Sequence, residues 1–82
     1  MDLCHELKGL IAAELGMPIS EVTDELSAGS VDAWDSLGHL KLILRIEENF
    51  KVKFKTEQIV EATTVRKIYE QLKEFGVSDG EK

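Results

Sequence analysis

The run from residue 36 to residue 50 limits the fold of this chain more than any other part of the sequence. Wound at about 100° per residue, its apolar residues fall into two groups on different sides of one helix. The wider group spans an arc of about 100° and contains Leu42, Ile43, Ile46 and Phe50. The narrower group spans an arc of about 60° and contains Leu37, Leu40 and Leu44. The run is therefore predicted to be a helix with a core face and a second apolar strip.

The second strip has two interpretations. A helix at the surface of a domain needs only one apolar face to pack on its own core. The narrower group is then either a contact with a second neighbouring element or an exposed strip on which a partner docks. Charged residues lie beside it, namely Lys41, Arg45 and Glu48. The sequence alone leaves both interpretations open.

The start of this helix carries a polar pair, Asp35 and Ser36. Asp and Ser are residues that cap helices, and the capped end attracts anions because its backbone N–H groups are unpaired and the helix dipole is positive there. The plainest interpretation is a helix cap. A serine at this position would also present its hydroxyl group where a phosphate is stabilised.

The remaining periodic segments predict two further long helices and one short one. Apolar residues recur at helical spacing from Leu3 to Leu15, with Asp2 as a candidate cap, and Gly16 and Pro18 end the pattern. A long loop follows from residue 17 to residue 33, with a helical turn near Ser20. Its apolar residues are predicted to be held on the core, namely Ile19, Val22 and Leu26.

After the central helix, the segment 51–55 alternates like a strand but has no second strand to pair with. We expect an extended turn that sends Val52 and Phe54 into the core. A short helix over residues 56–61 should face inward with Ile59 and Val60, and a last helix begins after Thr63 or Thr64 and ends at Gly76. The sequence thus predicts an all-α fold: a small helical bundle of three main helices plus one short helix, with a long loop between helices 1 and 2.

Length and composition set limits on function. The 82 residues predict a single domain, 1–82, with its core at about 3–75 and a frayed tail at 77–82. A chain of this size buries only about 60% of the surface that its unfolded form exposes, so a deep catalytic pocket is not expected. We therefore expect no enzyme activity. The only histidines and cysteine are His5, His39 and Cys4, and they do not form a metal-ligand pattern.

Charge and apolar runs exclude two kinds of partner. The net charge is −6, and residues 1–36 contain eight acidic residues against one lysine. Nucleic acid is therefore not expected as a partner, since phosphate binding needs a basic face. No apolar run reaches the roughly 20 residues of a membrane span, and the single Cys4 fits a reducing compartment. We expect a cytoplasmic monomer without membrane insertion.

Three short motifs at fixed separations give the chain a family resemblance. Asp35-Ser36-Leu37 opens the central helix, Glu47-Glu48-Asn49-Phe50 closes it, and Ala62-Thr63-Thr64-Val65 opens the last helix. In this arrangement, the chain resembles the acyl carrier proteins from about Leu3 to Phe75. The resemblance implies a four-helix bundle and a carrier function in fatty acid biosynthesis, in other lipid metabolism or in a secondary-metabolite pathway.

The resemblance also assigns roles to residues of this chain. Ser36 would receive 4′-phosphopantetheine from coenzyme A, attached by a separate phosphopantetheinyl transferase, and acyl groups would then be carried as thioesters on its terminal thiol. Asp35 matches the acid that helps to organise the metal and phosphate in the transferase complex, and Leu37 lies next to the attachment site. The implied contacts with the transferase and with acyl-loading and acyl-processing enzymes are Leu37, Leu40, Leu44, Glu47 and Glu48.

The chain also departs from the family pattern. Gly38 stands where many fatty-acid carriers have an acid, and a glycine within a helix costs about 1 kcal/mol relative to alanine. Lys41 and Arg45 place positive charge on the partner-binding face, where common carriers are acidic or neutral. These differences lead to the hypothesis of a specialised carrier with its own partner enzymes.

Three alternatives remain beside the acyl carrier. An aminoacyl or peptidyl carrier would share the same cofactor and a similar bundle. An unmodified helical adaptor would use the strip Leu37, Leu40 and Leu44 to bind another protein and would not need Ser36. A hydrolase is a third alternative because Trp34-Asp35-Ser36-Leu37 is similar to the Gly-Asp-Ser-Leu esterases and His39 follows, but such enzymes need a strand before the serine and a larger α/β scaffold.

Overall fold

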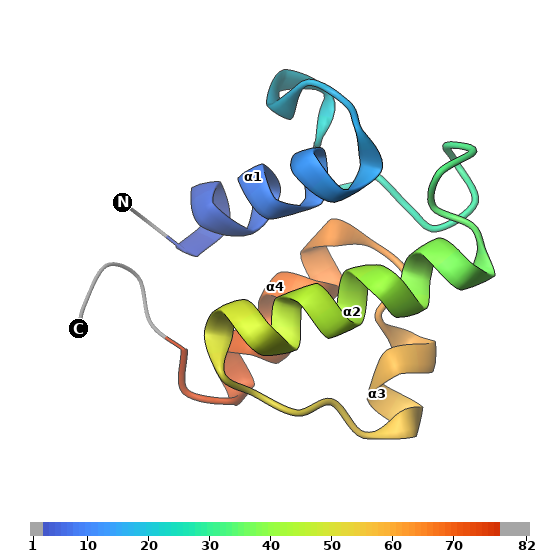
Figure 1. Ribbon diagram of the computed structural model, residues 1–82. Coiled ribbons are helices and arrows are strands. Elements are labelled where there is room, and N and C mark those ends of the chain that lie inside the picture. The colour runs from blue at the N-terminus through green and yellow to red at the C-terminus, as the bar shows by residue number, and fades with distance from the viewer. Residues whose placement is uncertain (1–2, 78–82) are drawn as a thin grey trace.

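Residues 3–77 are described by the computed structural model, and within them the chain is helical (Figure 1). The elements are α1 (Leu3–Leu15), a single 3-10 turn η1 (Ile19–Glu21), α2 (Ser36–Phe50), α3 (Thr56–Glu61) and α4 (Val65–Glu74). The described residues contain no strand, only an isolated bridge between Ser27 and Thr64. The predicted all-α fold, with three main helices and one short one, is confirmed. The candidate cap Asp2 and the predicted tail from 78 to 82 lie outside the described residues.

The ends of α2 follow from local chemistry. Asp35 has an extended backbone, and its side chain accepts a hydrogen bond from the backbone N–H of Gly38, which makes it the N-cap. At the other end, Lys51 adopts the left-handed conformation with φ 62°, and its N–H donates to the carbonyl of Glu47. These two residues confirm the predicted bounds of the central helix.

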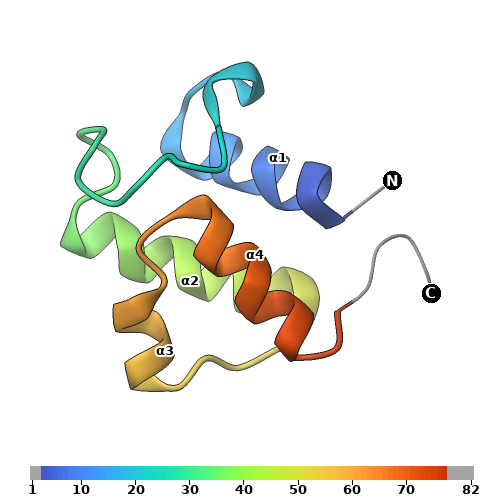
Figure 2. The same cartoon turned by 180° about the vertical axis from the view of Figure 1, so that it is seen from behind.

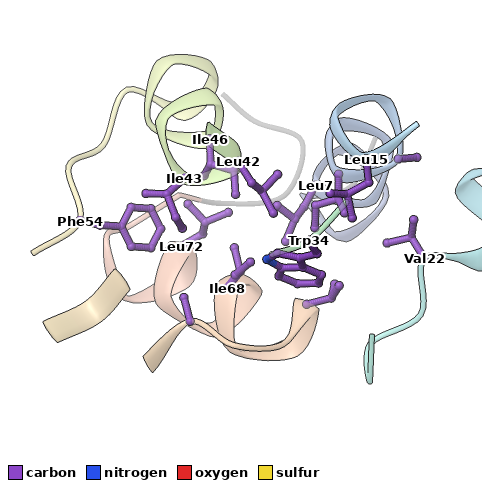
Figure 3. Close-up of a cluster of buried hydrophobic side chains, with 14 of the residues drawn as sticks. Leu7, Leu15, Val22, Trp34, Leu42, Ile43, Ile46, Phe54, Ile68 and Leu72 are labelled. Carbon is purple, nitrogen blue, oxygen red and sulfur yellow. The ribbon is translucent and has the colours of Figure 1, made fainter. Parts of the chain in front are cut away.

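A single core joins α1, α2 and α4 (Figure 3). From α2 it receives Leu42, Ile43 and Ile46, each at most 1% exposed, and Phe50 packs at its edge. The wider apolar group of the sequence is thus the core face of α2. Trp34 comes from the loop before α2 and is fully buried beside Leu7 and Ile68 in the close-up. The core therefore holds both the central helix and the chain segment that leads into it.

The long loop between α1 and α2 passes beside the start of α4 (Figure 2). Val22 is only 2% exposed, and Leu26 packs against the core. Backbone hydrogen bonds then join the loop to the start of α4: Ala28 N–H donates to the carbonyl of Thr63, and Val65 N–H donates to that of Leu26. The loop is consequently an ordered crossover that carries the chain to α2.

Two residues predicted to face the core are exposed in the structure. Val60 is 67% exposed and Ile19 is 39% exposed, whereas Val52 packs against the core as predicted. Ile59 and Val60 are neighbours about 100° apart on a helix, so a single surface contact covers only one of them, and Ile59 is the one that packs inward. Phe54 is buried as predicted, and the centroid of its ring lies 5.3 Å from that of Phe75 in an edge-to-face contact.

After α4, the chain stays on the core one residue further than predicted. Val77, expected as the first residue of the frayed tail, packs against the core, and its N–H donates to the carbonyl of Leu72. Gly76 turns the chain back toward the core with φ 89°.

No helix within residues 3–77 is long and apolar enough to cross a membrane.

Candidate functional site

Ser36 is the first residue of α2, and its side chain is exposed. The residue before it holds the helix start in place: Asp35 Oδ1 accepts from the N–H of Gly38 at 2.8 Å, and the Asp35 carbonyl accepts from the N–H of His39 at 2.7 Å. The serine hydroxyl is thus presented to solvent from a turn with a defined backbone. A reaction partner can reach it without any rearrangement of the core.

The backbone around Ser36 suits an anionic group. Within residues 3–77, the N–H groups of Ser36 and Leu37 make no hydrogen bond, whereas those of Gly38 and His39 donate to Asp35. Free N–H groups and the positive end of the helix dipole stabilise a negative charge at this position. A phosphate joined to the Ser36 hydroxyl would lie within this favourable field.

Gly38 is required by close packing of the chain on itself. A Cβ atom at this position would lie 2.1 Å from the carbonyl oxygen of Ala33, which belongs to the turn before Ser36. The carbonyl is backbone and cannot rotate away like a flexible side chain. The glycine that departs from the family pattern therefore lets the turn approach the first turn of α2. Sequence reasoning missed this role because the contact spans the helix boundary.

Trp34 anchors the same turn from inside the core. Its side chain is fully buried, its carbonyl accepts from Gly29 N–H at 2.7 Å, and its own N–H donates to the carbonyl of Val31 at 3.1 Å. The indole N–H donates to Nδ1 of His39 at 2.9 Å. The sequence offered a signal for this contact, since a buried tryptophan N–H needs a partner and His39 is five residues away.

His39 is partly buried, and both of its ring nitrogens have partners other than Ser36. Nδ1 accepts from Trp34, and Nε2 lies 2.8 Å from the carbonyl oxygen of Ile59. A histidine that activates a serine must hydrogen-bond to the serine hydroxyl. The arrangement of His39 therefore argues against the hydrolase alternative.

The narrower apolar group of α2 lies at the surface. Leu37, Leu40 and Leu44 are 62%, 51% and 59% exposed. No second element covers them within the described residues, so the interpretation as a second core contact is excluded. We call these three residues the leucine strip. It begins directly beside Ser36 and runs along the outer face of α2.

The charged residues beside the leucine strip are placed differently from one another. Lys41, Arg45 and Glu48 are exposed, and Arg45 Nε lies 3.3 Å from Glu14 Oε1 in α1. Glu47, by contrast, has a side chain only 11% exposed, and its Oε2 accepts from the N–H of Phe54 at 2.8 Å. Glu47 thus fixes the turn after α2, and this geometry argues against its predicted contact with partner enzymes.

Metal-binding residues do not gather anywhere in the described part of the chain. No group of three His, Cys, Asp or Glu residues within residues 3–77 is arranged to hold a metal ion. Cys4 is a free, partly exposed cysteine in α1. The chemically distinctive place is therefore the exposed hydroxyl at the start of α2, together with the apolar strip beside it.

A small helical bundle with an exposed serine at a helix N-terminus and an apolar strip beside it has the form of a carrier domain. A family model described as the phosphopantetheine attachment site matches residues 5–72. The chain belongs to this family of phosphopantetheine-dependent carrier proteins. Carriers of this family hold 4′-phosphopantetheine covalently, interact with phosphopantetheinyl transferases and with partner enzymes, and typically have no catalytic activity of their own.

Proposed function

We propose that this chain is an acyl carrier protein that holds its acyl group as a thioester on 4′-phosphopantetheine attached to Ser36. The observation that carries the proposal is the exposure of the Ser36 hydroxyl at the N-terminus of α2, within the span matched by the family model. The free N–H groups of Ser36 and Leu37 support the same residue, because they would stabilise the phosphate joined to it.

The attachment reaction uses one atom of this chain. The Ser36 oxygen forms a bond to the pantetheine-side phosphorus of coenzyme A, and the bond from that phosphorus to the adenosine-bearing phosphate breaks. Adenosine 3′,5′-bisphosphate leaves, and the hydroxyl proton passes to a base of the transferase. When bound, the cofactor supplies the thiol that carries the acyl group. Asp35 would hold the first turn of α2 during this transfer through its hydrogen bond to Gly38.

The leucine strip is the proposed docking face for the transferase and for acyl-loading and acyl-processing enzymes. Exposed apolar side chains next to the attachment point favour this role, since Leu37 is the neighbour of Ser36 and Leu40 lies one helical turn further along α2. Lys41, Arg45 and Glu48 would contact the rim of the partner surface. The positive charge of Lys41 and Arg45 supports a specialised carrier that recognises its own set of enzymes.

The proposal includes the finer features expected from the sequence. The chain would act as one domain over residues 1–82, as a monomer in the cytoplasm, without catalytic activity of its own. Its pathway would be fatty acid, lipid or secondary-metabolite biosynthesis. An aminoacyl or peptidyl carrier is the second candidate, because the same exposed serine and apolar strip would serve it equally well.

Intact mass measurement tests the attachment. The apo protein is incubated with coenzyme A and a broad-specificity phosphopantetheinyl transferase, beside the variants Ser36→Ala and Ser20→Ala. Ser20 is an exposed serine in η1 and provides the matched control. We expect a gain of one phosphopantetheine group in the wild type and in Ser20→Ala, and none in Ser36→Ala. The absence of any gain in the wild type would favour the unmodified adaptor.

The cargo is tested in a second step with the modified protein. The holo form is offered to an acyl–acyl carrier ligase with a fatty acid and, separately, to adenylation enzymes with amino acids. Thioester formation with the fatty acid alone supports the acyl carrier. Loading with an amino acid alone would support the aminoacyl or peptidyl carrier instead.

A further inference from the structure

The ring of His39 joins three parts of the molecule that are separate in sequence. Its Nδ1 meets the indole N–H of Trp34, two residues before Ser36, and its Nε2 meets the carbonyl of Ile59 in α3. His39 itself belongs to the first turns of α2. The ring therefore connects the turn that carries Ser36, the helix that Ser36 opens, and α3.

The two partners determine where the proton of the ring lies. The indole N–H of Trp34 is only a donor, so Nδ1 of His39 must accept, and the carbonyl of Ile59 is only an acceptor, so Nε2 must donate. Both bonds form together only in the neutral tautomer with its proton on Nε2. The stacked arrangement of the two rings, with centroids 6.1 Å apart and planes inclined by 27°, agrees with a fixed ring orientation.

The third element of this link, α3, is held by polar contacts as well as by the packing of Ile59. Helix α3 has six residues and none of them is fully buried. Two side chains from neighbouring helices donate to carbonyls of its last turn: His39 to Ile59, and Gln71 Nε2 of α4 to Gln58 at 3.1 Å. An element with so little buried apolar surface depends on such contacts for its position.

We propose that the link from Trp34 through His39 to Ile59 is a positioning device for Ser36, and that His39 is a positioning residue for its modification. The proposal rests on the attachment of phosphopantetheine at Ser36. The buried side chain of Trp34 holds the backbone two residues before Ser36. Its indole N–H donates to His39, which lies three residues after Ser36. Loss of the link removes one of the contacts that hold this turn, while the leucine strip remains in place.

This geometry predicts a specific change in transferase kinetics. Docking depends on the leucine strip, so the KM for the carrier should stay close to the wild-type value. The orientation of the Ser36 hydroxyl depends on the link, so kcat should fall when the link is broken. Loss of one hydrogen bond of ordinary strength corresponds to roughly two- to tenfold in an equilibrium, and we expect a fall in kcat of that size.

Two variants remove the Trp34–His39 bond from opposite ends. Trp34→Phe deletes the indole N–H and keeps an aromatic ring in the core. His39→Gln keeps an amide group that reaches toward Ile59 and removes the acceptor for Trp34. His39→Asn is the conservative variant, because its amide oxygen lies near the position of Nδ1 and can still accept from Trp34. His5→Gln, at the other histidine of the chain, is the matched control.

The test is a double-mutant cycle in kcat with the broad-specificity transferase at pH 8. Trp34→Phe and His39→Gln should each lower kcat, and their combination should lower it no further than the more severe single variant. His39→Asn should restore the part of kcat that depends on the bond to Trp34. Thermal unfolding identifies any variant that has lost its fold. His39→Gln and His39→Asn keep Trp34 and decide the matter if Trp34→Phe fails to fold.

Magnetic resonance gives an independent readout. Trp34 is the only tryptophan, so the protein has one indole N–H signal. That signal should move toward the position of an unbonded indole N–H in His39→Gln, stay in the hydrogen-bonded range in His39→Asn, and keep its position in His5→Gln. Wild-type kcat in a folded His39→Gln variant, or additive effects in the cycle, would overturn the inference. A wild type that is not modified, or is modified as well in Ser36→Ala, would instead overturn the attachment at Ser36.

Discussion

The two apolar faces of α2 contain the same kinds of side chain and serve different purposes. Leu42, Ile43 and Ile46 are at most 1% exposed and join α2 to the core, whereas the residues of the leucine strip are more than half exposed on the other side. The inner face contributes to the free energy of folding through burial. The outer face keeps apolar surface exposed beside Ser36. A single helix thus separates stability from recognition by the direction of its side chains.

The largest effect should come from shortening one leucine on each face. Leu42→Ala opens a cavity in the core and should lower the free energy of unfolding by about 3 kcal/mol, within the range measured for buried leucines. Leu40→Ala removes the same atoms from the surface and should change the free energy of unfolding by about 0.5 kcal/mol or less. Urea unfolding of the two variants measures the difference. Equal destabilisation would mean that Leu40 is packed as tightly as Leu42.

The next largest effect on stability should come from Gly38, a residue of the first turn of α2 that belongs to neither apolar group. Gly38→Ala places a Cβ atom against the carbonyl of Ala33 and should destabilise the protein by about 1–3 kcal/mol, despite the better helix propensity of alanine. Gly9→Ala in α1 is the control, since its Cβ would lie 3.7 Å from Ile19 in ordinary contact. That variant should be neutral or more stable. If both glycine variants behave alike in thermal unfolding, the close approach at Gly38 is not rigid.

Recognition should respond to the outer face with almost no change in stability. Leu44→Ala should lower kcat/KM with the transferase by about tenfold, or about 1.4 kcal/mol, which is typical of an apolar interface contact. Ile19→Ala changes an exposed apolar residue away from α2 and should leave kcat/KM unchanged. The comparison fails if the transferase modifies the Leu44→Ala variant at the wild-type rate while the variant keeps the wild-type melting temperature.

Charge beside the leucine strip should have a smaller, salt-dependent effect. Reversing Lys41 and Arg45 to Glu should change kcat/KM with a native partner enzyme by about two- to fivefold, because rim charges act mainly on the association rate. Stability should change by less than about 1 kcal/mol, since the Arg45–Glu14 pair is exposed. Lys67→Glu on α4 is the control. Identical rates with every native partner at low and high salt would refute the hypothesis of a specialised carrier.

The smallest effect should come from the ion pair between α1 and the loop. Lys8 Nζ lies 3.0 Å from Asp24 Oδ1, and a hydrogen bond from Lys8 lowers the pKa of Asp24 below its ordinary 3.8. The same bond raises the pKa of Lys8 above 10.5. The stabilising contribution of Asp24 is therefore complete above its ordinary pKa and is lost as pH falls through its lowered pKa. That of Lys8 is complete below 10.5 and is lost as pH rises through its raised pKa.

This pair is tested by the pH dependence of unfolding in Asp24→Asn. The difference in unfolding free energy between wild type and variant should be greatest near neutral pH and should shrink toward pH 2. Asp32→Asn, at an exposed position in the same loop, serves as the control. A difference that does not vary with pH would show that the Lys8 hydrogen bond does not depend on the charge of Asp24.

The sequence predicted the features that depend on local rules. The bounds of α2, its cap at Asp35 and its two apolar groups follow from helical spacing and capping preference alone. Thr64 is likewise the cap of α4, where its hydroxyl accepts from the N–H of Lys67. These predictions succeed because residues within one or two turns determine them.

The features that the sequence did not predict depend on residues distant in the chain. Glu47 faces inward because the chain returns at Phe54, and Gly38 is needed because the carbonyl of Ala33 approaches it. The exposure of the leucine strip depends on which elements pack beside α2. Spacing could place the strip on a separate side of the helix, but it could not show that no neighbour covers it.

The most direct test of the account locates the cofactor on one atom of the chain. Cleavage after Lys8 and Lys41 gives a peptide of residues 9–41, which contains Ser20, Ser27, Ser30 and Ser36. Fragmentation of this peptide from the modified protein should place the whole added mass on Ser36 and leave the other three serines unmodified. Added mass on any of those three would contradict the assignment of the helix N-terminus as the attachment site.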